Sequence, residues 1–291
     1  MSRSSALEAA GPAALRAAMR EMWEAVAPAW GVHADYIDAR AAGLTAALLE
    51  ASALCPGQRV LELACGAGGA GIAAAALVAP GGEVVLSDVS EQMVAIAAAR
   101  ASARGVTNVR AKRLDAEDID EPDDSFDAVF CREGLMFAVA PARAVADIHR
   151  VLRPGGRAVV TVWGPPAGNP WMRLVFETLA AELGAPAAPP GMPGPFSLSD
   201  ADGLAALFTS AGFAGVAVHE HPVGLRSPSV DDWFSRTVEL AGPLAKKLAG
   251  LPAERREAVR DRLAERAQPY IAPDGVVLPG LSLLATGQKP A

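Results

Sequence analysis

The middle of the chain alternates short apolar runs with stretches in which apolar side chains recur every three or four residues. The short runs lie at Val60–Ala64, Val84–Leu86, Val109–Leu114, Phe126–Phe130 and Ala158–Val162. Helical stretches at Ile72–Leu77, Glu91–Arg104 and Pro141–Leu152 separate most of them. Buried strands that alternate with helices are typical of parallel βαβ units. We therefore expect an α/β fold with a doubly wound, mostly parallel sheet.

Helical patterns precede this region. Met19, Met22 and Trp23 begin one apolar face, and Pro28 is expected to end that helix. A second helix is expected from about Ala34, and Pro56-Gly57 marks the end of the opening region.

The pattern after residue 165 is more irregular. We expect helices that begin at Asn169-Pro170, Ser199, Ser229 and Pro252, with Gly184 as the stop of the first and Leu248 within the third. A loop is expected over Ala185–Pro195, and strands are expected at Val216–Pro222 and Leu281–Ala285.

Composition narrows the class of protein. Of the 291 residues, 51% are hydrophobic, which is too many for a disordered chain. The formal net charge of −7 argues against a nucleic-acid partner, because phosphate contacts need clustered Lys and Arg. No apolar run approaches the length of a membrane span, and no signal peptide is expected. The three cysteines form no C-x-x-C pair, so we expect a cytoplasmic protein without a metal site.

The strongest chemical signal is the glycine-rich turn after the strand Val60–Ala64. Gly66, Gly68 and Gly71 match G-x-G-x-x-G, in which glycines let the backbone approach a ligand at a helix N-terminus. Asp88 ends the next strand, where a carboxylate can accept both ribose hydroxyls. These features fit either NAD or S-adenosylmethionine.

Two acidic positions distinguish the two ligands. Glu62 lies inside the strand, where it would face the pyrophosphate of a dinucleotide but would favour a ligand that carries an ammonium group. Asp115 closes the third strand, where a carboxylate can accept from an adenine amino group. Both favour S-adenosylmethionine, and an NAD(P)-linked oxidoreductase stays as the alternative.

Five segments together resemble one enzyme family. They are VLELACGAGG, LSDVSEQMVAIAAAR, RLDAEDI, FDAVFCREGLMF and HRVLRPGG, and they span about Val60 to Trp163. In this order they resemble the class I S-adenosylmethionine-dependent methyltransferases of the type-11, ubiquinone/menaquinone-methyltransferase-like group. The resemblance implies a Rossmann-like sheet of seven strands with a final antiparallel strand, and methyl transfer to O, C or N of a small-molecule acceptor such as a quinone-like metabolite or natural product.

The same resemblance implies the cofactor-binding residues. Those around the methionine part are Glu62, Ala64, Gly66 and Gly68; Asp88 is the ribose-binding acid; those near the adenine are Val89, Met93, Asp115 and Ala116; and those in the loop that faces both methionine and acceptor are Cys131 and Arg132.

The resemblance also suggests how one domain, residues 1–291, is organised. We expect an N-terminal helical cap over residues 1–52 and a cofactor-binding core over 53–165. The remaining sheet is expected over 166–291, with lid insertions at about 169–195 and 229–272.

Catalysis needs a general base only if the acceptor must lose a proton. His33 is one candidate, because it follows Trp30 in the link between the two opening helices, and the resemblance implies that this region covers the active face. Glu133 is the other, beside the loop after the fourth strand. A non-catalytic module that binds S-adenosylmethionine stays as a further alternative.

Overall fold

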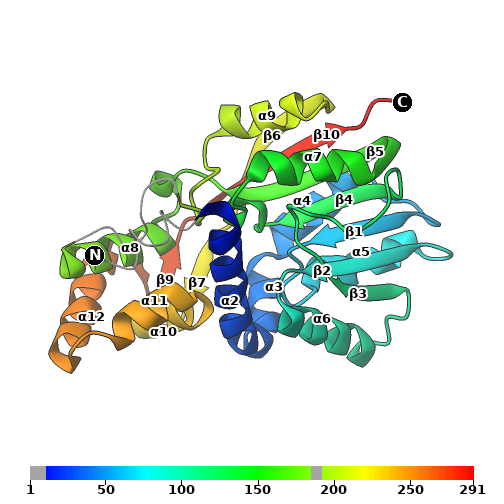
Figure 1. The fold of residues 1–291 in the computed structure, drawn as a ribbon. Coiled ribbons are helices and arrows are strands. Elements are labelled where there is room, and N and C mark those ends of the chain that lie inside the picture. Colours follow the sequence, from blue (N-terminus) through cyan, green and yellow to red (C-terminus); the bar gives the residue numbers. More distant parts are fainter. Residues whose placement is uncertain (1–10, 185–191) are drawn as a thin grey trace.

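A central seven-stranded sheet organises the computed structural model, which describes residues 11–184 and 192–291 (Figure 1). Its strands are β1 (Arg59–Leu63), β2 (Glu83–Asp88), β3 (Val109–Arg113), β4 (Phe126–Arg132), β5 (Leu152–Trp163), β6 (Ala214–Pro222) and β10 (Leu281–Gln288). They lie in the order β3-β2-β1-β4-β5-β10-β6. The first five are parallel, whereas β10 is antiparallel to both β5 and β6. The predicted fold class is therefore confirmed.

Helices cover both faces of this sheet. Eleven α-helices lie in the described residues: α2 (Gly11–Val32), α3 (Ala34–Arg40), α4 (Ala42–Ser52), α5 (Gly69–Val78), α6 (Glu91–Ala103), α7 (Pro141–Val151), α8 (Pro170–Leu183), α9 (Ala201–Ser210), α10 (Val230–Leu240), α11 (Gly242–Ala249) and α12 (Ala253–Ala267). Ile148 of α7 and Phe208 of α9 share one buried cluster with Val129 of β4. Leu48 of α4 and Ile72 of α5 share another with strand residues that point to the opposite face. Alternate side chains of the strands therefore fill two separate cores.

A second, smaller sheet lies beyond the edge of the first. It consists of β7 (Leu225–Ser227), β8 (Ile271–Ala272) and β9 (Gly275–Leu278), in the antiparallel order β7-β9-β8. Helices α8, α10, α11 and α12 pack with it around one buried cluster that includes Trp171, Trp233 and Leu278. In Figure 1 this body lies on the opposite side of α2 from β1, β2 and β3. The sequence patterns did not predict the small sheet, because its strands are only two to four residues long.

The second opening helix, expected as one from about Ala34, is divided at Ala41 into α3 and α4. Three further predicted element boundaries are wrong. Pro28 lies inside α2 and does not end it. Proline in a helix interior costs about 3 kcal/mol. Trp30, two residues later, donates to Leu240 O and packs on Gly66, and such tertiary contacts favour the uninterrupted helix. Asp200, and not Ser199, caps α9: its Oδ2 accepts from the Gly203 N–H at 2.8 Å, whereas the Ser199 hydroxyl donates to Phe196 O.

The third wrong boundary concerns the long helix expected from Ser229. Ser229 caps α10 as predicted, but that helix ends at Leu240, and α11 begins after Ala241. A Gly-Pro pair follows the break in the sequence, and both residue types disfavour a continuous helix. In the expected loop over Ala185–Pro195, residues 185–191 lie outside the described residues. None of the helices in the described residues is long and apolar enough to cross a membrane.

Candidate active site

The glycine-rich turn joins the end of β1 to the start of α5. Glu62 is buried in β1, and its Oε2 accepts a hydrogen bond from the Gly71 N–H at 2.8 Å. A methyl group added at Gly71 would overlap Glu62 and Leu86, so this helix can approach the strand only with glycine there. The carboxylate therefore holds the first turn of α5 in place.

Asp88, at the end of β2, holds the other side of the same turn. Its Oδ2 accepts from the Gly66 N–H at 3.0 Å, and its Oδ1 accepts from the Ser90 N–H at 3.0 Å. The turn itself has left-handed backbone at Ala64 (φ 52°), Gly66 (53°) and Gly68 (81°). The structure thus brings together five of the predicted cofactor residues at one edge of the sheet.

Burial disfavours the ionised form of both acids. Burial raises the pKa of Glu62 to about 8, although the Arg132 guanidinium and the Gly71 N–H lower it. Burial likewise raises the pKa of Asp88 to about 6, against the hydrogen bonds from Ser90 and Gly66. Raised pKa values of this kind are common at functional sites, where a bound donor or cation stabilises the ionised form.

The predicted adenine-side residues lie next to Asp88. The Leu114 N–H donates to Asp88 O, which places Asp115 beside the end of β2, and Asp115 Oδ1 accepts from the Glu117 N–H at 2.9 Å. Met93 is buried in the first turn of α6. An open pocket of about 580 Å³ lies here between α2 and the start of α6, lined by Arg20, Glu21, Glu24, Ala25, Val89, Glu91, Gln92 and Arg113.

Cys131 and Arg132 end β4, next to β1. Leu63 pairs with Cys131 across the two strands. The Arg132 guanidinium donates to Thr45 Oγ1 at 2.7 Å and lies 3.6 Å from Asp38 Oδ1. Both predicted residues therefore lie at the same edge as the glycine turn.

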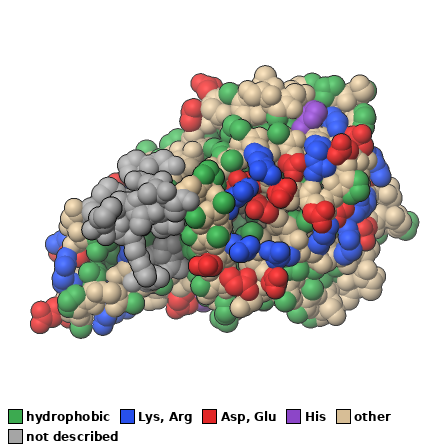
Figure 2. Space-filling view, viewed as in Figure 1, with side chains coloured by type: hydrophobic (Ala, Val, Ile, Leu, Met, Phe, Trp, Pro, Cys, Tyr) green, Lys and Arg blue, Asp and Glu red, His purple; other side chains and the backbone are tan. Residues whose placement is uncertain are grey.

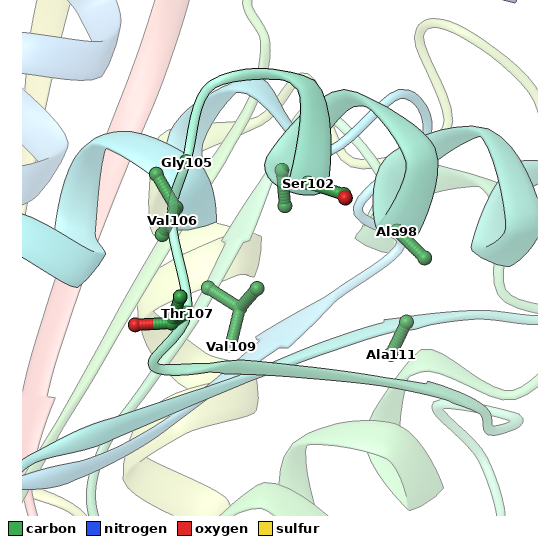
Figure 3. A pocket seen from close by; sticks show the side chains of 8 residues that line it. Ala98, Ser102, Gly105, Val106, Thr107, Val109 and Ala111 are labelled. Carbon is green, nitrogen blue, oxygen red and sulfur yellow. The ribbon is translucent and has the colours of Figure 1, made fainter.

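A smaller pocket lies away from this edge. It has a volume of about 230 Å³, and small side chains of α6 and β3 line it, such as Ala98, Ser102 and Val109 (Figure 3). Gly105–Thr107 precede β3, so this pocket lies toward the amino end of that strand. Ligands of open α/β sheets bind outside the carboxyl ends, which makes this pocket a poor candidate.

Side chains of the N-terminal helices cover the glycine turn. The Trp30 ring packs on Gly66, with ring carbons 3.3 Å from where a Cβ would lie. Asp38 of α3 packs on Gly69, and Arg100 of α6 donates to Ala67 O at 2.6 Å. No sequence pattern pointed to Asp38 or Arg100, because only the packing of α3 and α6 brings them to the turn.

The two candidate bases have different partners. His33 Nε2 lies 2.6 Å from Glu239 Oε2 of α10, at a partly exposed position. Glu133 follows β4 with left-handed backbone (φ 55°), and its carboxylate accepts from Arg40 Nη2 at 3.1 Å and from Ser282 Oγ at 3.0 Å. Strained backbone of this kind clusters at functional sites.

An aromatic group lies beside Glu133. Trp163 of β5 pairs with Ser282 of β10. Its ring lies edge-on to the Trp171 ring, with the two ring centres 4.5 Å apart. The Arg40 guanidinium that binds Glu133 also lies 5.0 Å from the Trp171 ring centre. Phe176 and Phe196 extend the group. Sequence patterns did not identify these aromatics as a group, because they come from separate segments.

Comparison with known proteins agrees with this geometry. Residues 60–156 match a family model described as a methyltransferase domain. A ubiquinone/menaquinone biosynthesis C-methyltransferase, UbiE of Ectopseudomonas mendocina (strain ymp), is 34% identical over 189 residues, which are 65% of this chain and 69% of that protein. The chain belongs to the class I S-adenosylmethionine-dependent methyltransferases, in their type-11 group.

Two further proteins are similar to this chain over different lengths. The UbiE enzyme of Proteus mirabilis (strain HI4320) is 35% identical over 127 residues, 43% of this chain and 51% of that protein. The crystal structure of the YcgJ protein from Bacillus subtilis superposes with a TM-score of 0.58 at 20% identity, over 85% of this chain and 98% of that one. The latter shows the shared fold. None of these matches supports an NAD(P)-linked oxidoreductase.

The ligand edge of this methyltransferase fits its cofactor, S-adenosylmethionine. Close backbone at Gly66 and Gly68, with buried carboxylates at Glu62 and Asp88, suits a ligand that carries an ammonium group and ribose hydroxyls. The cofactor supplies a methyl group on a positively charged sulfur, so the protein's own task is to position an acceptor and exclude water.

Proposed function

We propose that this methyltransferase acts on a planar, hydroxylated aromatic small molecule bound beside Trp163, Trp171 and Glu133. The supporting observation is the Glu133 carboxylate, held with left-handed backbone between Arg40 and Ser282 at the edge of an aromatic group. Trp163 adds a buried Nε1 that has no hydrogen-bond partner among the described residues. Aromatic walls with a few polar groups are typical of sites for aromatic ligands.

Two other observations support a small aromatic acceptor. The UbiE relatives are named for ubiquinone and menaquinone biosynthesis, and quinones are planar rings. On the face drawn in Figure 2, acidic and basic side chains are intermixed and form no broad basic surface. A nucleic-acid acceptor would favour such a surface.

In this proposal, the predicted cofactor residues hold the cofactor at the ends of β1 to β4. The cap over residues 1–52 and the insertions at about 169–195 and 229–272 enclose the acceptor. Glu133 accepts a hydrogen bond from the acceptor hydroxyl and so orients the ring. It can also take the proton, whereas His33 is the second candidate base, on the cap.

A methylation screen tests the proposed acceptor class. The enzyme would be incubated with S-adenosylmethionine and either a reduced 1,4-naphthoquinone, a simple phenol, an aliphatic alcohol or an aliphatic amine. We expect S-adenosylhomocysteine release and a methylated product only with the hydroxylated aromatics, detected by mass spectrometry. Methylation of the aliphatic probes alone would contradict the proposal.

Two variants distinguish the candidate bases. If Glu133 orients and deprotonates the acceptor, Glu133→Gln lowers kcat about 10²–10⁴-fold, because general base catalysis contributes that much. The affinity for S-adenosylhomocysteine should stay unchanged. His33→Gln, which keeps a polar partner for Glu239, is the matched variant and should retain most of the turnover. If His33→Gln lowered kcat this much and Glu133→Gln did not, His33 would be the base.

A further inference from the structure

Two partly buried arginines converge on the Asp38 carboxylate above the glycine turn, and the more exposed Arg104 lies 3.8 Å from it. Asp38 Oδ2 lies 2.8 Å from Arg100 Nη2, and Asp38 Oδ1 lies 3.6 Å from Arg132 Nη2. The two arginine side chains are only 14% and 10% exposed. Partly buried guanidinium groups need an anionic partner, and Asp38 supplies one from the cap.

The same carboxylate lies directly on the start of α5. A methyl group added at Gly69 would overlap Asp38, so the carboxylate and the first residue of the helix are in close contact. The Trp30 ring covers Gly66 in the same way, three residues earlier in the turn. Side chains of α2 and α3 therefore fill the space over the turn, where the methionine part of the cofactor is assigned.

We propose that Asp38 is an internal substitute for the cofactor's carboxylate. When the methyl donor binds, its amino-acid carboxylate replaces Asp38 on Arg100 and Arg132, and α2 and α3 move off the turn. This inference rests on the methyltransferase assignment. One carboxylate is exchanged for another, so neither arginine is left without an anion, which would be costly.

Asp35 provides a matched control one helical turn earlier. Its carboxylate also binds Arg100, at 3.0 Å, but it is 90% exposed. It forms ion pairs with Arg100 and Arg104 of the C-terminal part of α6 and its end. Removing this charge changes the surroundings of Arg100 without freeing the position on Gly69.

Calorimetric titration with two ligands tests the exchange. S-adenosylhomocysteine has the amino-acid carboxylate, whereas 5′-methylthioadenosine has the same adenosine and thioether without it. Asp38→Asn should tighten binding of S-adenosylhomocysteine about tenfold, the effect expected when one competing charged hydrogen bond is removed. Binding of 5′-methylthioadenosine should change much less, and Asp35→Asn should alter neither.

Arg100→Gln gives an independent test. This test remains valid even when the Asp38→Asn variant does not fold. The substitution should weaken the binding of S-adenosylhomocysteine more than the binding of 5′-methylthioadenosine. Thermal unfolding checks that the variant is folded. Equal effects of either variant on the two ligands would overturn the exchange, because they would indicate only a looser cap. Unchanged or weaker S-adenosylhomocysteine binding in Asp38→Asn would overturn it too. If the unaltered chain bound neither ligand, the methyltransferase assignment itself would be contradicted.

Discussion

Glu62 and Asp88 combine a structural role with a position at the predicted cofactor site. Each accepts hydrogen bonds from backbone N–H groups of the turn or of the residues beside it, and each is buried at the sheet edge. Burial raises both pKa values because it disfavours the ionised form, and a bound cation or hydroxyl donor would stabilise that form. The free energy of unfolding at neutral pH is therefore lower than it would be if both groups kept their ordinary pKa values.

That cost can be measured for Glu62. As the pH rises from about 4.5 to about 8, an unfolded glutamate loses its proton while Glu62 in the folded state keeps it. The folded state then binds more protons, so the free energy of unfolding falls with pH, by up to about 1.4 kcal/mol per unit. Glu62→Gln lacks this term and should show a flatter decline in denaturant titrations between pH 5 and 8. Asp88 is present in both proteins, so its contribution cancels. Parallel pH curves would contradict the raised pKa.

The site residues that sequence spacing could identify are those fixed by the strands. Glu62, Gly66 and Asp88 follow from the order of strand, turn and helix, because the carboxyl ends of parallel strands meet at one edge. Trp30 and Asp38 could not be found this way. Their positions depend on how α2 and α3 pack across the sheet, and no local motif encodes that packing.

At the scale of elements, α2 and α3, which lie in the predicted cap over residues 1–52, contact the rest of the molecule on two sides. Trp30 Nε1 donates to Leu240 O at 3.0 Å, and His33 binds Glu239, so α10 holds the outer side of the cap. On the inner side, Ser90 Oγ donates to Glu24 of α2 at 2.6 Å. The cap therefore links the cofactor edge to the smaller sheet and its helices.

Hydrogen exchange tests whether this cap moves. In the proposed exchange, Trp30 and Asp38 leave the turn when the ligand binds, so amide exchange over residues 23–40 should differ between free protein and protein saturated with S-adenosylhomocysteine. Helix α7, which packs in the core of the opposite face, is the internal control and should not change. Equal exchange rates over residues 23–40 in both states would contradict a moving cap.

The helices and strands of the central sheet could be predicted from the sequence. The boundaries of the elements in the cap and in the smaller body could not. Alternating apolar runs placed β1 to β5 because parallel strands are buried on both faces. Pro28 misled the prediction because tertiary contacts outweigh a local helix penalty. The short strands β7, β8 and β9 pair only through long-range contacts, which local periodicity cannot report.

The whole molecule joins two bodies at the proposed acceptor site. Arg40 of α3 contacts Glu133, which follows β4 of the main sheet, and Trp171 of α8. The Arg236 guanidinium of α10 lies 4.0 Å from the ring centre of Tyr36 of α3. Cap, sheet and smaller body thus meet around Glu133. A movement of α2 and α3 would therefore change the cofactor edge and the acceptor region together.

A crystal structure of the complex with S-adenosylhomocysteine tests the central claim most directly. We predict the ligand at the carboxyl ends of β1 and β2, with its ribose beside Asp88 and its carboxylate on Arg100 and Arg132. Trp30 should no longer pack on Gly66. A ligand bound elsewhere, or Trp30 still on Gly66 with the ligand bound, would contradict the account.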